Sequence, residues 1–207
     1  MSNKLLAFKK KLKSKIFFDH NIGKYTWFRT GGNAKIFAIV ENSSELEIIL
    51  NEINNDNFYI LGSGSNLLVR DNGYNGTILK LGKGFNTINI NDNKLEVGAS
   101  ILDINLSNFA LKNNIEGFEF YSGIPGSIGG AVKMNAGCFG SETKDVINCV
   151  EIYNNFSEKK ILKKNDIELS YRSSNIKSNQ IITKVIFELN YGKNSHIKDK
   201  IENIKKQ

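Results

Sequence analysis

The feature that most constrains this chain is the stretch YSGIPGSIGGAVKMNAG, from Tyr121 to Gly137. It holds the only proline of the 207 residues, Pro125, together with five of the 18 glycines. Proline fixes φ, whereas glycine permits φ angles and close backbone approaches that a Cβ atom forbids. The stretch therefore predicts a backbone that follows one path close to something else, either another part of the chain or a ligand.

Length and composition predict a globular protein of one large or two small domains. Hydrophobic residues make up 40% of the chain and charged residues 24%. No apolar run approaches the roughly 20 residues of a membrane helix, and the early run at 16–18 is too short for a signal-peptide core. Two cysteines, Cys138 and Cys149, provide neither a disulfide framework nor a metal-ligand spacing. We therefore expect a cytoplasmic protein with no membrane partner and no metal.

The net charge of +7 comes largely from lysines near the two ends of the chain. Such segments are typical of solvated helix faces, and nucleic-acid binding is the alternative. A nucleic-acid surface favours arginine and exposed aromatic side chains, yet only three of the 28 basic residues are arginines. We therefore expect no nucleic-acid partner. The three arginines, Arg29, Arg70 and Arg172, each lie within or beside a short motif.

The hydrophobic pattern predicts an α+β fold. We expect strands at 35–40, 58–61, 67–69, 76–81, 146–154 and 180–191, and a hairpin of 87–90 with 94–100. We expect helices over 42–56 and 102–112 and a basic helix at the C-terminus. The first helix should begin with a capping box of Ser44 and Glu47, and the second should turn Leu102, Leu106, Phe109 and Ala110 inward. A soft domain boundary is expected near residues 82–92.

The segment YILGSGSNLLVR contains a Gly-Ser loop between two expected strands. Successive backbone N–H groups of such a loop can form a nest that binds phosphate, and a side chain at Gly64 would then enter the nest. A Rossmann fingerprint is excluded because Leu67 replaces the third glycine and a strand follows. A Walker A loop is excluded because no Gly-Lys-Ser/Thr is present. A plain Gly-Ser turn fits the segment equally well.

The stretch around Pro125 is a second candidate site. One surface of this stretch would have no side chains at three positions, Gly126, Gly129 and Gly130. Ser127 would place a hydroxyl group on the same surface. A flat ring system could pack against that surface, with its polar edge facing backbone groups. The alternative is tight packing of a helix on a sheet, which also favours small residues.

The segment ELSYRSS is the third candidate, because it carries Arg172 after Tyr171. The guanidinium group could pair with a surface carboxylate or bind a carboxylate or phosphate of a substrate. The two histidines, His20 and His196, neighbour no plausible nucleophile, and no cluster of metal ligands is visible.

Four motifs in series, TWFRTGGNA, LGSGSNLLV, GIPGSIGGAVKMNAGCFGSE and YRSS, resemble those of the UDP-N-acetylenolpyruvoylglucosamine reductase family over residues 15–195. The resemblance implies an α+β fold, the two-lobed FAD-binding domain of the vanillyl-alcohol-oxidase (PCMH) type. The implied division is a basic arm or helix at 1–15, one lobe at 16–85, a second lobe at 86–192, and a basic helix at 193–207 that leads to a third domain.

The resemblance also implies the ligands, which are non-covalent FAD, NADPH as co-substrate, and a UDP-sugar of peptidoglycan synthesis. The FAD pyrophosphate would be held by Gly62, Ser63, Gly64, Ser65, Asn66 and Leu67. The flavin and its attached chain would be lined by Ile124, Pro125, Gly126, Ser127, Gly129, Gly130, Asn135, Ala136 and Gly137. Arg172 would be catalytic, and Tyr171 and Arg172 would contact the substrate.

The sequence departs from the family pattern at its end. Family members continue with a segment that carries a Ser or Cys general acid and a Glu, and this chain stops at Gln207 before either. We therefore expect one of two situations. Either the chain is a non-catalytic FAD-binding remnant or fragment, or it turns over slowly unless a second chain supplies that segment.

Overall fold

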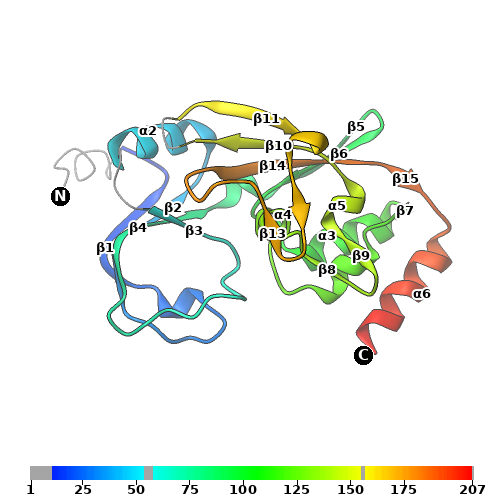
Figure 1. The fold of residues 1–207 in the computed structure, drawn as a ribbon, viewed down its shortest axis with the longest axis horizontal. Helices are drawn as coiled ribbons and strands as arrows, with labels where there is room; N and C mark the ends of the chain where they lie inside the picture. Colours follow the sequence, from blue (N-terminus) through cyan, green and yellow to red (C-terminus); the bar gives the residue numbers. More distant parts are fainter. Residues whose placement is uncertain (1–10, 54–57, 155–156, 207) are drawn as a thin grey trace.

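The computed structural model describes residues 11–53, 58–154 and 157–206, and it places two β-sheets next to each other (Figure 1). The expected N-terminal arm or helix falls mostly on residues 1–10, outside the described ranges. None of the described helices is long and apolar enough to cross a membrane.

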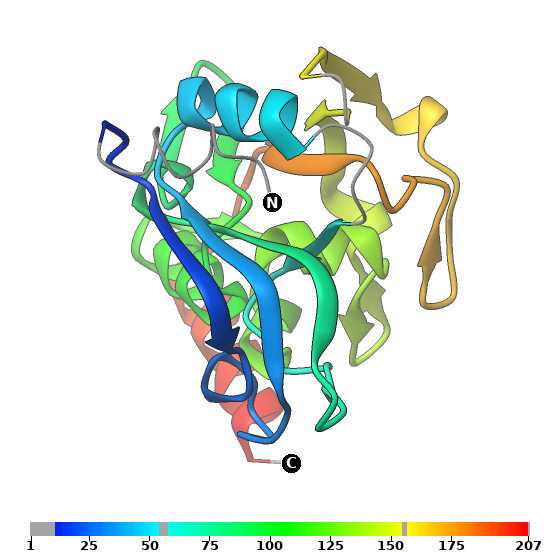
Figure 2. The ribbon, with the colours of Figure 1, turned by 90° about the vertical axis from the view of Figure 1, so that its left-hand side faces the viewer.

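The first sheet comes from residues 15–81, and its strands run in the order β1-β2-β4-β3. Strand β1 pairs antiparallel with β2, whereas β2 and β3 both run parallel to β4. Figure 2 shows β1, β2 and β4 side by side, with α2 across one end of them. The elements are β1 (Lys15–Asn21), β2 (Asn33–Val40), α2 (Ser43–Ile53), β3 (Phe58–Leu61) and β4 (Tyr74–Leu81).

Two parts of this sheet differ from the sequence-based expectation. Strand β1 was not expected, although its Ile16 is buried in the core. The strand expected at 67–69 was wrong, because these residues form a loop. The carbonyl of Arg70 accepts a hydrogen bond from Gly32 N at 3.0 Å. Arg70, which follows these residues, is thus bonded to a neighbouring loop and not to a sheet ladder.

Helix α2 forms as expected and buries Leu46, Ile49, Leu50 and Ile53, but the predicted capping box was wrong. Asn42 precedes the helix, and its Oδ1 accepts a hydrogen bond from Glu45 N at 2.9 Å, which satisfies one of the free N–H groups of the first turn. Glu47 instead accepts a hydrogen bond from the Tyr153 hydroxyl at 3.1 Å.

The second sheet comes from residues 88–188, and its strands are antiparallel in the order β11-β10-β14-β6-β5. The predicted hairpin of β5 and β6 and the two predicted long strands are confirmed. The members are β5 (Ile88–Asn91), β6 (Lys94–Gly98), β10 (Ile147–Tyr153), β11 (Lys159–Lys163) and β14 (Ile181–Glu188).

Helices and short hairpins lie beside this second sheet (Figure 1). Leu102, expected to face inward, instead precedes its helix in extended backbone and is 42% exposed. The helical elements are α3 (Asp103–Lys112), η3 (Glu119–Gly123), α4 (Ile128–Lys133), α5 (Thr143–Val146) and α6 (Asn194–Lys205). The short strands pair as β7 (Ile115–Glu116) with β15 (Asn190–Tyr191), β8 (Gly137–Cys138) with β9 (Ser141–Glu142), and β12 (Leu169–Ser170) with β13 (Ser173–Ser174).

The two sheets share part of their hydrophobic core. The cluster around α2 and β2 contains Leu46 and Val40 of the first sheet region, and also Tyr153 and Ile181 from the second sheet. The chain passes from one sheet to the other between Leu81 and Ile88. The lobe bounds at 85 and 86 stay a prediction, but the passage falls within the expected interval.

Candidate functional site

A cleft of about 1120 Å³ is lined by loops from both sheet regions. All three candidate segments, separated by up to about a hundred positions in the chain, lie on its wall. The predicted residues found there are Gly62, Ser63, Gly64, Ser65, Asn66, Leu67, Ile124, Pro125, Gly126, Ser127, Gly129, Gly130, Asn135, Ala136, Gly137, Tyr171 and Arg172. Tertiary structure therefore brings these segments together around one space, and the role of each residue stays a prediction.

The loop after β3 forms one part of the wall. Within the described part of the chain, the backbone N–H groups of Ser63, Gly64 and Ser65 donate no hydrogen bond to protein. The hydroxyl oxygens of Ser63 and Ser65 lie 3.1 Å apart. The loop thus offers several free donors to the cleft, which is the chemistry that a phosphate group needs.

The surroundings of Gly64 differ from those expected from the sequence. Its φ is +75°, and a Cβ atom there would lie 2.2 Å from the carbonyl oxygen of Tyr25. Its own carbonyl accepts a hydrogen bond from Trp27 N at 3.0 Å. The expectation that a side chain at Gly64 would enter the nest was therefore wrong, because the side chain would strike the backbone of Tyr25 and Thr26, where the TWFRTGG motif begins.

The glycines around Pro125 also divide into two kinds. A Cβ atom at Gly126 would lie 2.3 Å from Asp103 Oδ2, and one at Gly129 would lie 3.0 Å from Ala99 Cβ. These two glycines allow the chain to pack on itself. At Gly130 the nearest atom to a Cβ would be Ser127 Oγ, at the ordinary contact distance of 3.6 Å. Gly130 is exposed on the cleft, so its missing side chain leaves space for a ligand.

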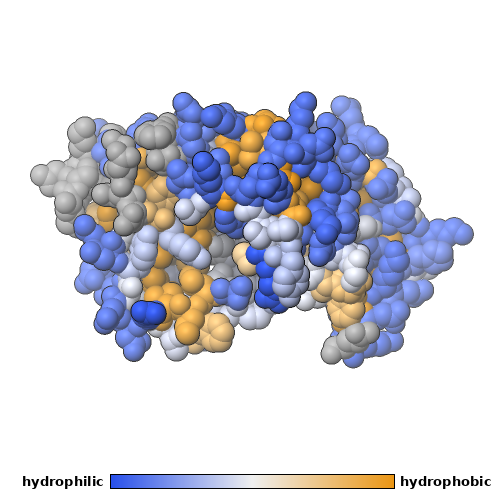
Figure 3. Space-filling model, viewed as in Figure 1, coloured by the Kyte–Doolittle hydropathy of each residue, from blue (hydrophilic) through white to orange (hydrophobic). Residues whose placement is uncertain are grey.

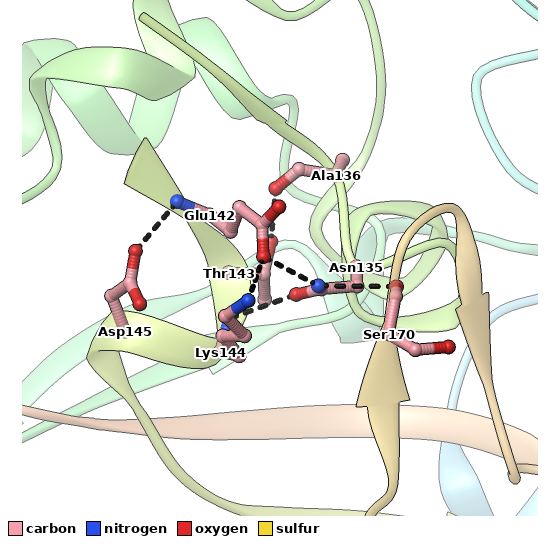
Figure 4. Close-up of polar contacts among 7 residues, drawn as sticks. All are labelled: Asn135, Ala136, Glu142, Thr143, Lys144, Asp145 and Ser170. Carbon is pink, nitrogen blue, oxygen red and sulfur yellow. Dashed lines mark hydrogen bonds and ion pairs between the residues drawn. The ribbon is translucent and has the colours of Figure 1, made fainter. Parts of the chain in front are cut away.

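The side chain of Asn135 connects separate segments of the cleft wall through hydrogen bonds (Figure 4). Its Nδ2 donates to Glu142 Oε2 at 2.9 Å and to Ser170 O at 3.2 Å. Its Oδ1 accepts a hydrogen bond from Lys144 N at 3.0 Å. Both hydrogens of this amide are therefore used within the protein, and its side chain acts as a positioning group, while Ala136 and Gly137 continue the wall.

Arg172 lies at the tip of the β12–β13 hairpin, beside the exposed Tyr171, whose ring centroid is 5.7 Å from Arg172 Cζ. Its φ is +51°, an uncommon conformation for a residue other than glycine. Ion pairs of the described residues do not include Arg172. The guanidinium group is thus at the cleft, without a carboxylate partner in the described chain.

Charged residues that the sequence patterns did not single out also line the cleft: Glu41, Lys80, Lys83, Asp103, Lys133, Glu142 and Lys177. Lys80 donates a hydrogen bond to the carbonyl of Gly62, and burial lowers the pKa of its ammonium group. Burial raises the pKa of the Asp103 carboxyl to about 8. A signal was present, because Lys80 and Asp103 each interrupt an apolar run. No group of three or more possible metal-ligating side chains occurs within the described ranges.

The fold and the cleft define a flavin-binding class of protein. The family described as "FAD binding domain" matches residues 34–155, more than half of the chain, and the chain belongs to this family. The α+β fold expected from the sequence, the two-lobed FAD-binding domain of the vanillyl-alcohol-oxidase type, is confirmed.

Within this flavin-binding class, the chain is similar in sequence to UDP-N-acetylenolpyruvoylglucosamine reductases. The chain is 43% identical over 181 residues to the UDP-N-acetylenolpyruvoylglucosamine reductase of Rickettsia rickettsii, a match that covers 86% of this chain and 61% of that protein. The corresponding match to the Rickettsia typhi reductase is 42% over 188 residues, with coverage of 90% and 63%. The chain thus spans about three fifths of the length of these curated relatives.

Solved structures agree with these relatives. The UDP-N-acetylenolpyruvylglucosamine reductase of Thermus caldophilus superposes with a TM-score of 0.81 at 29% identity, covering 94% of this chain and 69% of that one. The 6-hydroxy-D-nicotine oxidase of Arthrobacter nicotinovorans superposes with a TM-score of 0.62 at 13% identity over 87% and 43% of the two chains. The second likeness concerns the fold alone.

Proposed function

We propose that the chain takes part in the NADPH-driven, FAD-dependent reduction of UDP-N-acetylenolpyruvoylglucosamine to UDP-N-acetylmuramate, a step of peptidoglycan and hence cell-wall synthesis. The observation that carries the proposal is the convergence of the three motif segments on one cleft of about 1120 Å³. The reductase relatives, at 43% and 42% identity, support the choice of substrate.

The residues of the cleft fit FAD. Free N–H groups in the Gly62–Leu67 loop would hold the pyrophosphate, and Lys80 beside the loop would add positive charge. The open surface at Gly130 would receive the flavin ring or its attached chain, with the Ser127 hydroxyl beside it. These groups offer donors and space of the kinds that a dinucleotide requires.

We further propose that FAD is bound non-covalently. Cys138 lines the cleft, but its Sγ donates to the carbonyl of Phe120 at 3.0 Å, and burial raises the pKa of its thiol. A thiol with a raised pKa is a poor nucleophile at neutral pH. His20 lies in a stack with Phe17 and Phe37 in the first sheet, outside the cleft lining. The free thiols of Cys138 and Cys149 agree with a reducing compartment, and we propose the cytoplasm.

FAD, held by the Gly62–Leu67 loop and the surface at Gly130, would supply the hydride chemistry that reduces the substrate double bond. Arg172 would bind the carboxylate of the enolpyruvyl group and stabilise the negative charge that develops next to it. Tyr171, 81% exposed beside Arg172, would cover the substrate from the same hairpin. Asn135, bonded to the carbonyl of Ser170, would hold that hairpin at the cleft.

The test begins with the purified 207-residue chain and its absorbance spectrum. We expect a yellow protein that releases FAD on denaturation. Under anaerobic conditions the flavin is then photoreduced, substrate is added, and flavin reoxidation is followed, with Arg172→Ala as the comparison. Reoxidation that depends on Arg172, at unchanged flavin content, supports the proposal. A colourless protein that cannot be reconstituted with FAD would contradict the proposed function. FAD binding without reoxidation would favour a non-catalytic FAD-binding module.

A further inference from the structure

The wall of the cleft contains a buried carboxyl group without a partner. Asp103, in the first turn of α3, is 0% exposed. Neither Oδ1 nor Oδ2 has a hydrogen-bond partner among the described residues. A buried polar group without a partner is costly, and native proteins leave few of them. The group therefore calls for an explanation that the protein's own contacts do not provide.

The segment around Pro125 is fitted closely over this carboxyl group. Asp103 N donates to the carbonyl of Gly126 at 3.2 Å, and a Cβ atom at Gly126 would lie 2.3 Å from Asp103 Oδ2. Both residues line the cleft. The absence of a side chain at Gly126 thus leaves room for the carboxyl group in the part of the wall that we assign to the flavin.

The surroundings keep this carboxyl group neutral. Burial raises the pKa of Asp103 to about 8, and no described lysine or arginine forms an ion pair with it. Tyr121 is the neighbouring titratable group, but its hydroxyl donates to Thr143 Oγ1 at 3.1 Å. A protonated carboxyl group has an O–H donor, which needs an acceptor, and it also keeps an oxygen that can accept.

We propose that Asp103 donates a hydrogen bond to an acceptor atom, a carbonyl oxygen or ring nitrogen, of the bound flavin. The inference rests on the proposed binding of FAD in this cleft. Asp103 would then be a binding residue, and its missing partner would arrive with the ligand. The flavin would gain one directed contact from a group that carries no charge, in a wall that Gly126, Gly129 and Gly130 also line.

A buried water molecule is the competing explanation for the unpartnered oxygens. Ser107, one helical turn beyond Asp103, provides the matched comparison. Its hydroxyl is also buried without a partner among the described residues, but it does not line the cleft. If buried water molecules bind the unpartnered groups of α3, substitutions at Asp103 and at Ser107 should have the same effect on FAD affinity.

The experiment measures FAD affinity of the apo-protein by flavin fluorescence and unfolding of the same apo-protein without FAD. Asp103→Leu removes the donor and keeps the branch at Cγ, and we expect about tenfold weaker FAD binding with unchanged or raised apo stability. Asp103→Asn retains an N–H donor, and its affinity should stay within about threefold of wild type. Ser107→Ala should leave the affinity unchanged.

Equal FAD affinity of wild type and Asp103→Leu would overturn the role of Asp103 while leaving FAD binding intact. Failure of the wild type to bind FAD would instead overturn the proposed function. Should Asp103→Leu not fold, infrared difference spectra of wild type and Asp103→Asn decide. We expect a carboxylic-acid C=O band that shifts on FAD binding and is absent from Asp103→Asn. No band change, or loss of the band through ionisation, would contradict donation by a neutral carboxyl group.

Discussion

At the scale of single residues, the glycines of the motifs serve two different purposes. Gly64 and Gly126 are required because backbone or side-chain atoms of the protein lie within 2.3 Å of the place where a Cβ would be. Gly130 meets no such neighbour and opens onto the cleft. Substitutions at the two kinds of glycine should therefore separate stability from ligand binding.

Gly130→Leu should leave the apo-protein as stable as wild type or slightly more stable, because leucine is a better helix former than glycine by up to about 1 kcal/mol. The leucine side chain would occupy the cleft, so FAD binding should weaken by more than about tenfold.

Gly64→Val, in contrast, should cost at least about 1–2 kcal/mol of unfolding free energy, since the φ of Gly64 is positive. Urea unfolding and FAD titration measure the two effects, and a strongly destabilised Gly130→Leu would contradict the assignment.

Asp103 should make the stability of the apo-protein depend on pH. Its pKa is about 8 in the folded chain against the ordinary 3.8, so the folded state binds more protons than the unfolded state between these values. The free energy of unfolding should therefore fall as pH rises from about 4 to 8, by at most about 1.4 kcal/mol per pH unit from this group, and level off above.

Urea unfolding of wild type and Asp103→Asn across this pH range isolates the contribution of the carboxyl group. The difference in unfolding free energy should grow with pH in favour of the variant. Burial raises the pKa of Tyr121 well above this window, so its phenol should not interfere. Parallel profiles for the two proteins would show that Asp103 does not titrate with the raised pKa.

At the scale of elements, the hairpin of β12 and β13 depends on hydrogen bonds from a distant segment of the chain. Its tip carries Arg172, and two hydrogen bonds fasten it to the last residue of α4 and to Asn135, two residues beyond. Asn135 Nδ2 donates to Ser170 O at 3.2 Å, and Ser174 Oγ donates to Lys133 O at 2.8 Å. The position of the guanidinium group therefore depends on residues from a distant part of the sequence.

Asn135→Gly should loosen this hairpin without straining the backbone, because glycine accepts the positive φ of 42° at this position. We expect about tenfold faster amide hydrogen exchange across residues 169–174, since the variant loses a hydrogen bond of about 1 kcal/mol and its neighbours in the network. Asn148→Ala, which removes an amide bonded to Glu188 far from the hairpin, is the control. Unchanged amide hydrogen exchange in Asn135→Gly would show that Asn135 does not position the hairpin.

At the scale of the whole molecule, the shared core joins the two sheet regions into one unit. Tyr153 and Ile181 of the second sheet pack in the cluster around α2, and the Tyr153 hydroxyl donates to Glu47. The cleft between these regions is lined from both sides. A ligand bound there should therefore stabilise both regions together.

FAD at a hundred times its dissociation constant should stabilise the folded chain by about 2.7 kcal/mol. For a chain of this size that corresponds to a rise of about 5–11 °C in the melting temperature. Differential scanning calorimetry of apo- and FAD-loaded protein should show one transition that moves as a whole. Two transitions, of which FAD moves only one, would mean that the regions unfold separately.

The sequence by itself determined the fold class, most of the long strands and helices, and the three segments of the cleft. These depend on local patterns: alternation in β14, the apolar face of α2, and dense glycine around Pro125. Tertiary structure alone decided what faces each glycine, that residues 67–69 form a loop instead of a strand, and that Asp103 lies without a partner among the described residues, next to Gly126. The physical reason is that a Cβ contact or an unpaired carboxyl group depends on atoms distant in sequence, which no local pattern records.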